Sequence, residues 1–231
     1  MQRLLDEHLE KLKTRILKMC SLVDEQFQLA VKAVEEENLE TAKLVIERDA
    51  KVDKYDLKIE KICQKIFALS QPVAMDLRLI MSSMTLNTDL ERIGDISVNI
   101  CENILLIKKK PDFYNRTKLS EMFNLTKEML KNALDAYING NAELAKKVII
   151  ADDKVDSLNA ENHTILKSIM KENPENIEPA VALLVISREL ERVADHSTNI
   201  AEDVFFIVEA QLIKHKYEKY IFGEEEDDDK D

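Results

Sequence analysis

The chain contains the same sequence unit twice. Residues 38–53 match residues 141–156 at ten of sixteen positions, at an offset of 103. Residues 89–102 match residues 189–202 at eight of fourteen positions, at an offset of 100. An internal repeat of this extent means that the two halves share one fold, so the chain is expected to be a tandem of two similar units.

The composition restricts that shared fold to helices. Only 3 of the 231 residues are Gly and 4 are Pro, there is no Trp, and 34% of the residues are charged. Turns are therefore scarce, and the chain does not resemble a sandwich, a barrel or a Rossmann sheet. The glycines Gly94, Gly140 and Gly223 lie too far apart to form a phosphate-binding loop. We therefore expect an all-α protein.

Apolar residues recur every three or four positions in six stretches, three in each half. We place the helices at residues 2–36, 39–69, 72–108, 116–139, 141–172 and 178–215. Each helix carries an apolar stripe that it cannot bury alone, which favours antiparallel packing in threes. Pro111, which cannot continue a helix, lies between the halves. The sequence thus predicts two tandem three-helix bundles, residues 1–109 and 115–222, and a disordered acidic tail at 223–231.

The net charge and the cysteines indicate which partners the protein can bind and in which cellular compartment it works. Half of the net charge of −12 belongs to the tail, and because the rest of the chain is mildly acidic we expect no nucleic-acid binding. Cys20, Cys63 and Cys101 are odd in number and widely spaced, which favours buried thiols in a reducing compartment. No apolar run is long enough to span a bilayer. We therefore expect a soluble, cytoplasmic protein.

The repeated residues include pairs of carboxylates spaced four apart. These pairs are Asp49 and Asp53, Glu91 and Asp95, Asp152 and Asp156, and Glu191 and Asp195. Residues four apart lie about 40° from each other around a helix, so each pair shares one face. A helical projection turns the Glu91 and Glu191 pairs away from the bundle core. It places the Asp49 pair at the shoulder of the bundle, where it could meet the third helix.

Two interpretations fit these pairs. They are solvated charges relieved by Arg92, Arg188 and Arg192, or they hold a cation. Their retention in both halves favours the cation, since surface carboxylates have no packing reason to match. Carboxylate and Asn oxygens suit iron, manganese or magnesium, and the absence of repeated His or Cys disfavours a structural zinc site. The predicted metal ligands are Asp49, Asp53, Glu91, Asp95, Asp152, Asp156, Glu191 and Asp195.

No motif indicates catalysis. His196 follows Asp195 but corresponds to Ile96 in the first half, so we interpret it as an exposed or hydrogen-bonded side chain. Buried di-iron chemistry is disfavoured because it needs inward-facing Glu-x-x-His pairs. No nucleophile is paired with a base by a recognisable motif. We expect that the chain is not an enzyme, with a metallohydrolase as the alternative.

Three segments resemble the PhoU family of phosphate-specific transport accessory and regulatory proteins. They are residues 71–79 (QPVAMDLRL), 89–102 (DLERIGDISVNICE) and 188–202 (RELERVADHSTNIAE), and the resemblance extends over residues 1–215. It implies two similar three-helix bundles with multinuclear clusters, usually of iron or zinc, on E(D)-x-x-x-D motifs. By position these motifs fall on Glu91 with Asp95 and on Glu191 with Asp195, with Asp49, Asp53, Asp152 and Asp156 facing them. Ile96 stands where the family often has His, so the two sites need not be equal in metal content.

The resemblance also implies a function. PhoU-like proteins are thought to couple a phosphate ABC transporter, through its ATPase, to a membrane sensor histidine kinase. They hold the phosphate-starvation response off when phosphate is plentiful. We therefore expect a cytoplasmic, homodimeric adaptor that contacts membrane proteins without spanning the membrane. Two alternatives are an accessory of a low-affinity phosphate permease and a helical scaffold that works without metal.

Overall fold

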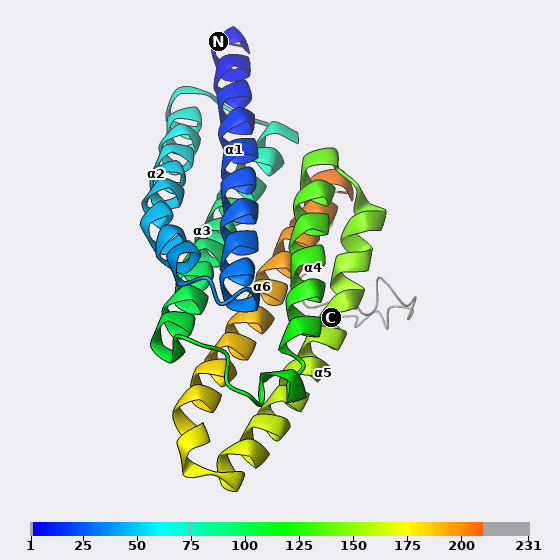
Figure 1. Cartoon of the computed structure of the whole chain (residues 1–231). Helices are drawn as coiled ribbons and strands as arrows, with labels where there is room; N and C mark the ends of the chain where they lie inside the picture. Colours follow the sequence, from blue (N-terminus) through cyan, green and yellow to red (C-terminus); the bar gives the residue numbers. More distant parts are fainter. Residues whose placement is uncertain (1, 74, 210–231) are drawn as a thin grey trace, which may run out of the picture.

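The computed structural model describes residues 2–73 and 75–209, and six long α-helices run through them (Figure 1). They are α1 (Gln2–Glu35), α2 (Leu39–Leu69), α3 (Met75–Ile107), α4 (Leu119–Asn139), α5 (Ala142–Glu172) and α6 (Ile177–Glu209). Two 3₁₀ turns, η1 (Tyr114–Arg116) and η2 (Pro174–Asn176), precede α4 and α6. No strand occurs in the described residues. The prediction of an all-α fold with six helices is confirmed.

The helix ends differ from the predicted ones at a few places. The third helix begins at Met75 rather than at residue 72, because the chain is extended at Ser70 after α2 ends. The sixth begins at Ile177, so Pro179 lies in its first turn, where a missing N–H leaves no hydrogen bond unmade. The predicted end of the sixth helix and the tail at 223–231 lie outside the described residues.

The duplication extends to the turns that join the first two helices of each half. Asn38 accepts a hydrogen bond from the backbone N–H of Thr41 at 3.0 Å, and Asn141 caps α5 in the same way at 3.0 Å from Leu144. These side chains satisfy an N–H that the helix itself leaves free. Gly140 ends α4 with a left-handed φ of 60°.

Each half is a three-helix bundle, α1 to α3 and α4 to α6, and α3 packs along α6 to join the two. A smaller contact joins α1 and α4. The buried aliphatic side chains of both bundles form one continuous core. The apolar stripes of the third and sixth helices are buried over most of their length, and only their last members, Ile107 and Ile207, are half-buried. The buried members are Leu90, Ile93, Ile100, Ile104, Leu190, Val193, Ile200 and Val204. All three cysteines are buried thiols, as predicted.

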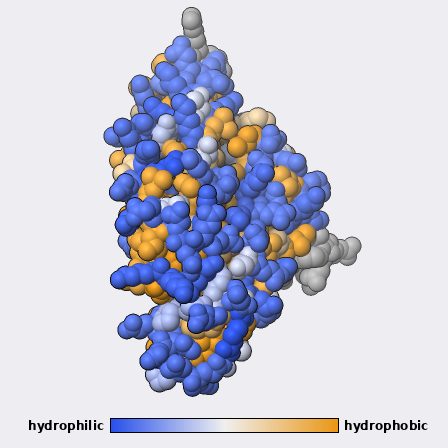
Figure 2. Space-filling view, viewed as in Figure 1, coloured by the Kyte–Doolittle hydropathy of each residue, from blue (hydrophilic) through white to orange (hydrophobic). Residues whose placement is uncertain are grey.

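The surface of the molecule is mainly polar. Figure 2 shows one face, on which hydrophilic residues predominate and hydrophobic ones gather in small separate patches. No helix within the described ranges combines the length and apolar character that crossing a bilayer requires. The charged faces of the helices, rather than an apolar surface, are therefore the first place to look for a functional site.

Candidate metal centres

The first carboxylate cluster lies where α2 and α3 come close together. Gly94 permits this approach, because a Cβ atom there would lie 3.2 Å from Asp49 Oδ1 and 3.2 Å from Val52 Cγ1. Asp95 follows Gly94 directly, and its charge acts on Asp49 together with that of Asp53. The predicted meeting of the second helix with the third is confirmed at this point.

The first cluster resists full ionisation. Burial raises the pKa of Asp49 above its ordinary value, and the charges of Asp53 and Asp95 raise it further. Burial also raises the pKa of Glu91, with Asp95 adding to the effect. A hydrogen bond from Gln26 Nε2 to Asp49 Oδ1, at 2.8 Å, acts in the opposite direction. The remaining repulsion is of the kind that a bound cation relieves.

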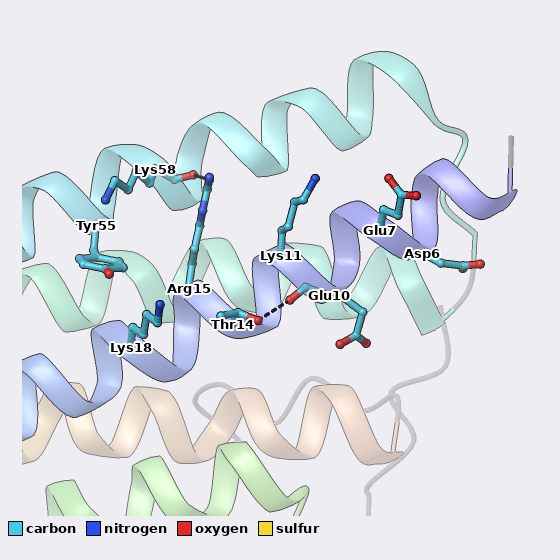
Figure 3. Close-up of a pocket in the computed structure, with 9 residues that line it drawn as sticks. All are labelled: Asp6, Glu7, Glu10, Lys11, Thr14, Arg15, Lys18, Tyr55 and Lys58. Atoms are coloured by element: carbon cyan, nitrogen blue, oxygen red, sulfur yellow. Dashed lines mark hydrogen bonds between the residues drawn. The ribbon is translucent and has the colours of Figure 1, made fainter.

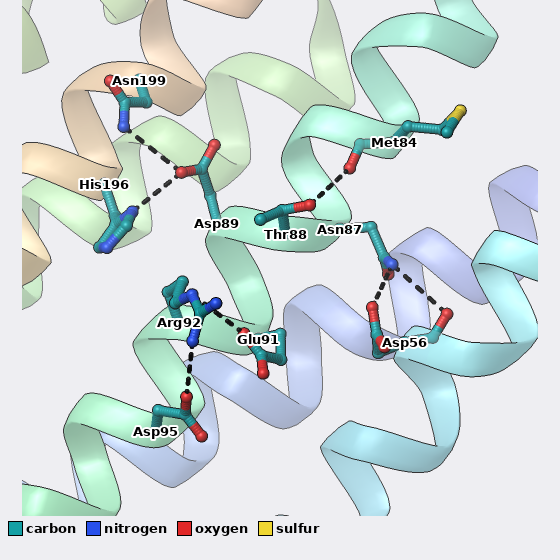
Figure 4. A network of polar contacts seen from close by, with 10 residues as sticks. All are labelled: Asp56, Met84, Asn87, Thr88, Asp89, Glu91, Arg92, Asp95, His196 and Asn199. Atoms are coloured by element: carbon teal, nitrogen blue, oxygen red, sulfur yellow. Dashed lines mark hydrogen bonds and ion pairs between the residues drawn. The ribbon is translucent and has the colours of Figure 1, made fainter.

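Arg92 partly neutralises this cluster. Its Nε lies 3.5 Å from Glu91 Oε2 and its Nη1 lies 3.3 Å from Asp95 Oδ2 (Figure 4). The arginine side chain is 52% exposed, and ion pairs this open to water are worth about 0–1 kcal/mol. An ion bound to Glu91 and Asp95 would therefore displace only weak interactions.

The second cluster lies between α5 and α6 and is more strongly perturbed. Burial raises the pKa of Asp152 to about 7, and the charges of Asp195 and Asp156 add to this effect. Burial likewise raises the pKa of Glu191 and of Asp195. Asp152 Oδ1 and Glu191 Oε2 are buried and have no hydrogen-bond partner. Buried oxygens of this kind call for a proton or a cation.

The polar stripe of α6 faces the other bundle over part of its length. Glu202 is only 9% exposed, although it lies on the same face of α6 as the Glu191 pair, which turns away from the core of its own bundle. It lines a hollow of about 340 Å³ together with Asp195, Asp152 of α5 and Asp89 of α3. The prediction that this stripe of α6 turns away from the core of its own bundle is therefore correct. The stripe is nevertheless shielded from solvent near Glu202, because α3 covers this part of α6.

Asp89 is a buried polar residue that the sequence analysis did not single out. Its Oδ1 lies 2.9 Å from His196 Nδ1 and 3.4 Å from Asn199 Nδ2, both on α6 (Figure 4). The interpretation of His196 as a hydrogen-bonded side chain is confirmed. Ile96, at the position corresponding to His196, is fully buried, so this polar link between the bundles has no counterpart in the other half.

The donors fit a hard cation in kind, since both clusters offer carboxylate oxygens from two facing helices. The unpartnered oxygens of Asp152 and Glu191 have no hydrogen bond to give up when an ion binds. In the part of the chain that the structure describes, no group of three or more His, Cys, Asp or Glu side chains is already arranged around one point. Binding an ion would therefore require these side chains to rotate toward one another.

Comparison with known proteins agrees with this architecture. The family model described as "PhoU domain" matches twice, at residues 16–104 and 119–204. The "Phosphate-specific transport system accessory protein PhoU homolog" of Aquifex aeolicus is 36% identical to this chain, over 92% of the chain and 96% of its own length. All eight predicted ligands lie within the two matched ranges.

Two solved structures share the whole fold. The crystal structure of PhoU from Pseudomonas aeruginosa superposes with a TM-score of 0.85 at 31% identity, covering 89% of this chain and 99% of that one. The phosphate transport system regulatory protein PhoU from Streptococcus pneumoniae gives a TM-score of 0.79 at 28% identity, covering 90% and 98%. The likeness therefore spans both bundles and the contact between them.

Proposed function

Because this chain belongs to the PhoU family of phosphate transport accessory proteins, we propose that it is a cytoplasmic, metal-binding regulator of phosphate uptake. In this role it couples the ATPase of a phosphate ABC transporter to a membrane sensor histidine kinase. It represses the phosphate-starvation response when phosphate is plentiful, and it works as a homodimer that binds its partners rather than as an enzyme. The relatives' names, which call them accessory or regulatory proteins, support this role.

The observation that best supports metal binding is the pair of buried, unpartnered oxygens on Asp152 and Glu191, within a cluster whose counterpart recurs in the other bundle. Asp156 and Asp195 complete the second set of ligands. The first set is Asp49, Asp53, Glu91 and Asp95. We propose multinuclear iron, with zinc, manganese and magnesium as alternatives. A bound cation supplies positive charge against which these repelling carboxylates ionise.

In this proposal the carboxylates act as a clamp. Those of α2 and α3, and those of α5 and α6, are drawn together across each pair of helices and fix its spacing. Asp53 and Asp156 lie at the exposed edge of each cluster. With metal bound, this edge presents positive charge that can bind phosphate or the acidic groups of a partner. Docking thereby becomes sensitive to whether the clamp is closed.

Replacing Glu91 and Asp95 together by Ala tests the clamp. Bound metal, measured by elemental analysis of the purified protein, is expected to fall, and binding to the transporter ATPase is expected to weaken. Glu102→Ala, an exposed carboxylate on the same helix, is the matched control and should change neither. Unchanged metal content would reject the metal site, and reduced metal with unchanged partner binding would reject the clamp.

A metal-independent scaffold is the second candidate, and the contacts of Arg92 with Glu91 and Asp95 favour it. In a scaffold these ion pairs, rather than a cation, balance the first cluster. Partner binding would then be the same with and without a chelator. Under the metal-binding proposal, the chelator weakens binding and added metal restores it.

A further inference from the structure

A groove between α1 and α2 carries six basic side chains, although the net charge of the chain is −12. It consists of two adjoining hollows, of about 740 and 540 Å³, that share Lys18, Tyr55 and Lys58. Figure 3 shows Arg15 reaching from α1 toward Lys58 on α2, with Tyr55 extending from α2 above Lys18. The basic residues that line this basic groove are Lys11, Arg15, Lys18, Lys51, Lys54 and Lys58.

Two of the cations in the basic groove contact groups that carry no negative charge. Arg15 Nη1 donates to the backbone oxygen of Lys58 at 2.5 Å, and Lys58 Nζ lies 4.4 Å from the centre of the Tyr55 ring. Among the described residues, none of the five lysines forms an ion pair with a carboxylate. Acidic residues line only one end of the larger hollow, at Asp6, Glu7 and Glu10.

The duplication shows that the fold does not require this charge. At an offset of 103, the positions of Lys54, Tyr55 and Lys58 are held in α5 by Ser157, Leu158 and Glu161. Lys154, which corresponds to Lys51, is paired with Glu121 of α4 at 2.9 Å. The second bundle therefore forms without an unbalanced basic groove, so the groove of the first bundle calls for a ligand of opposite charge.

We propose that the basic groove binds the chain's own acidic segment, residues 224–231. This segment, EEEDDDKD, carries seven carboxylates and one lysine, which complements the six cations of the groove. The residues between the end of α6 and this segment span up to about 50 Å when extended, at 3.3–3.6 Å each. In Figure 1 the end of α6 and the N-terminal half of α1 both lie in the upper part of the molecule.

An anionic membrane surface is the competing occupant, and the observations favour it less. The acidic end of the groove at Asp6, Glu7 and Glu10 would repel a flat anionic surface, whereas an extended peptide can bind beyond it. Other acidic peptides would compete with residues 224–231 for the same lysines. Because the contact is electrostatic and open to water, it weakens as the salt concentration rises.

Carbodiimide cross-linking of the full-length chain tests the proposal. The reagent joins a lysine amine to a carboxylate in contact with it, forming an amide with loss of water, and mass spectrometry locates the bond. At low salt, residues 224–231 are expected to be joined to lysines of the basic groove at least about fivefold more often than to exposed lysines of the second bundle, and the excess should vanish near 1 M salt. The comparison lysines are Lys131, Lys147 and Lys167.

Two variants of equal net charge distinguish binding in the basic groove from random cross-linking to exposed lysines. Replacing Lys18, Lys51 and Lys54 by Gln should reduce the cross-links that remain at Lys11 and Lys58 to background. The control, with Lys131, Lys147 and Lys167 replaced by Gln, has the same net charge and should keep the wild-type pattern. Equal cross-linking in the two variants, or cross-links spread evenly over all lysines, would overturn the proposal.

Two further outcomes decide the occupant. Mixing isotopically labelled and unlabelled chains shows whether the bond lies within one chain, as proposed, or only between two copies, which would overturn the assignment to the same chain. Phosphatidylglycerol vesicles supply the other probe. If vesicles bind the wild-type chain and abolish the groove cross-links while the three-lysine variant no longer binds them, the basic groove is a lipid site and the proposal is wrong.

Discussion

Gln26 and Met129 occupy corresponding positions in α1 and α4, and both are buried. The Gln26 amide donates to Asp49, which stabilises the ionised form of that carboxyl. A methionine has no N–H to donate, and Asp152, the counterpart of Asp49, has a buried Oδ1 without a partner. One residue on the helix opposite each acid pair thus makes the two clusters chemically different.

This difference predicts the effect of exchanging the two residues. Met129→Gln supplies a donor beside Asp152 and should lower the pKa of that carboxyl from about 7 by roughly one unit. Gln26→Met should raise the pKa of Asp49 further. Carbon-13 NMR titration of the aspartate carboxyl groups measures both. If Asp152 titrates at the same pH with Met and with Gln at position 129, positions 26 and 129 are not equivalent in the folded protein.

At the scale of the helices, the sequence predicts what lies within one bundle better than what lies between bundles. The apolar periodicity predicts the helices because it is a local signal. The four acid pairs were found because duplication repeats them, while Gln26 was missed because its counterpart is Met129. The sequence does not predict the packing of α3 along α6. A helical projection shows which face of a helix is apolar, but it does not show whether another helix covers the polar face.

The Asp89–His196 contact provides a test of that packing. His196→Ala leaves the buried Asp89 without its 2.9 Å partner and should lower the free energy of unfolding by about 1–3 kcal/mol. Asp89 also lies near other carboxylates, so Asp89→Ala both removes the contact with His196 and relieves repulsion between the acids. A double-mutant cycle is needed to isolate the contact. Urea unfolding of the four proteins should give a coupling energy of about 0.5–3 kcal/mol. Zero coupling would show that the contact does not join the bundles in solution.

The two clusters belong to separate pairs of helices, which predicts how metal loading responds to single changes. Asp95→Asn removes a ligand between α2 and α3, and Asp195→Asn removes one between α5 and α6. Each variant should lose the metal of its own cluster and keep that of the other, and the double variant should lose nearly all of it, since distant sites behave additively. Elemental analysis measures the content per chain. Complete loss in either single variant would instead indicate one shared site.

At the scale of the whole molecule, the shifted carboxyl groups link stability to pH. The folded pKa of Asp152 is about 7 and its ordinary value is 3.8, so between these values the folded chain binds more protons than the unfolded chain. Stability of the metal-free protein therefore falls as pH rises through this window. Asp49, Glu191 and Asp195, whose pKa values are also raised, contribute with the same sign. Glu121, whose pKa is lowered by Lys154, acts in the opposite direction, but only around and below its ordinary value of 4.5, in the lower part of this window.

Metal should reverse this dependence. In a chelated sample, the midpoint of thermal unfolding is expected to be higher at pH 5 than at pH 8, and Asp152→Asn should flatten the difference because an amide does not ionise. Added metal should raise the midpoint more at pH 8, where the ligands are deprotonated, by a gain of about 2.7 kcal/mol at a free concentration one hundred times Kd. Circular dichroism measures the transition. An equal effect of metal at both pH values would mean that the ion binds elsewhere, since only the clustered carboxylates release protons on binding in this range.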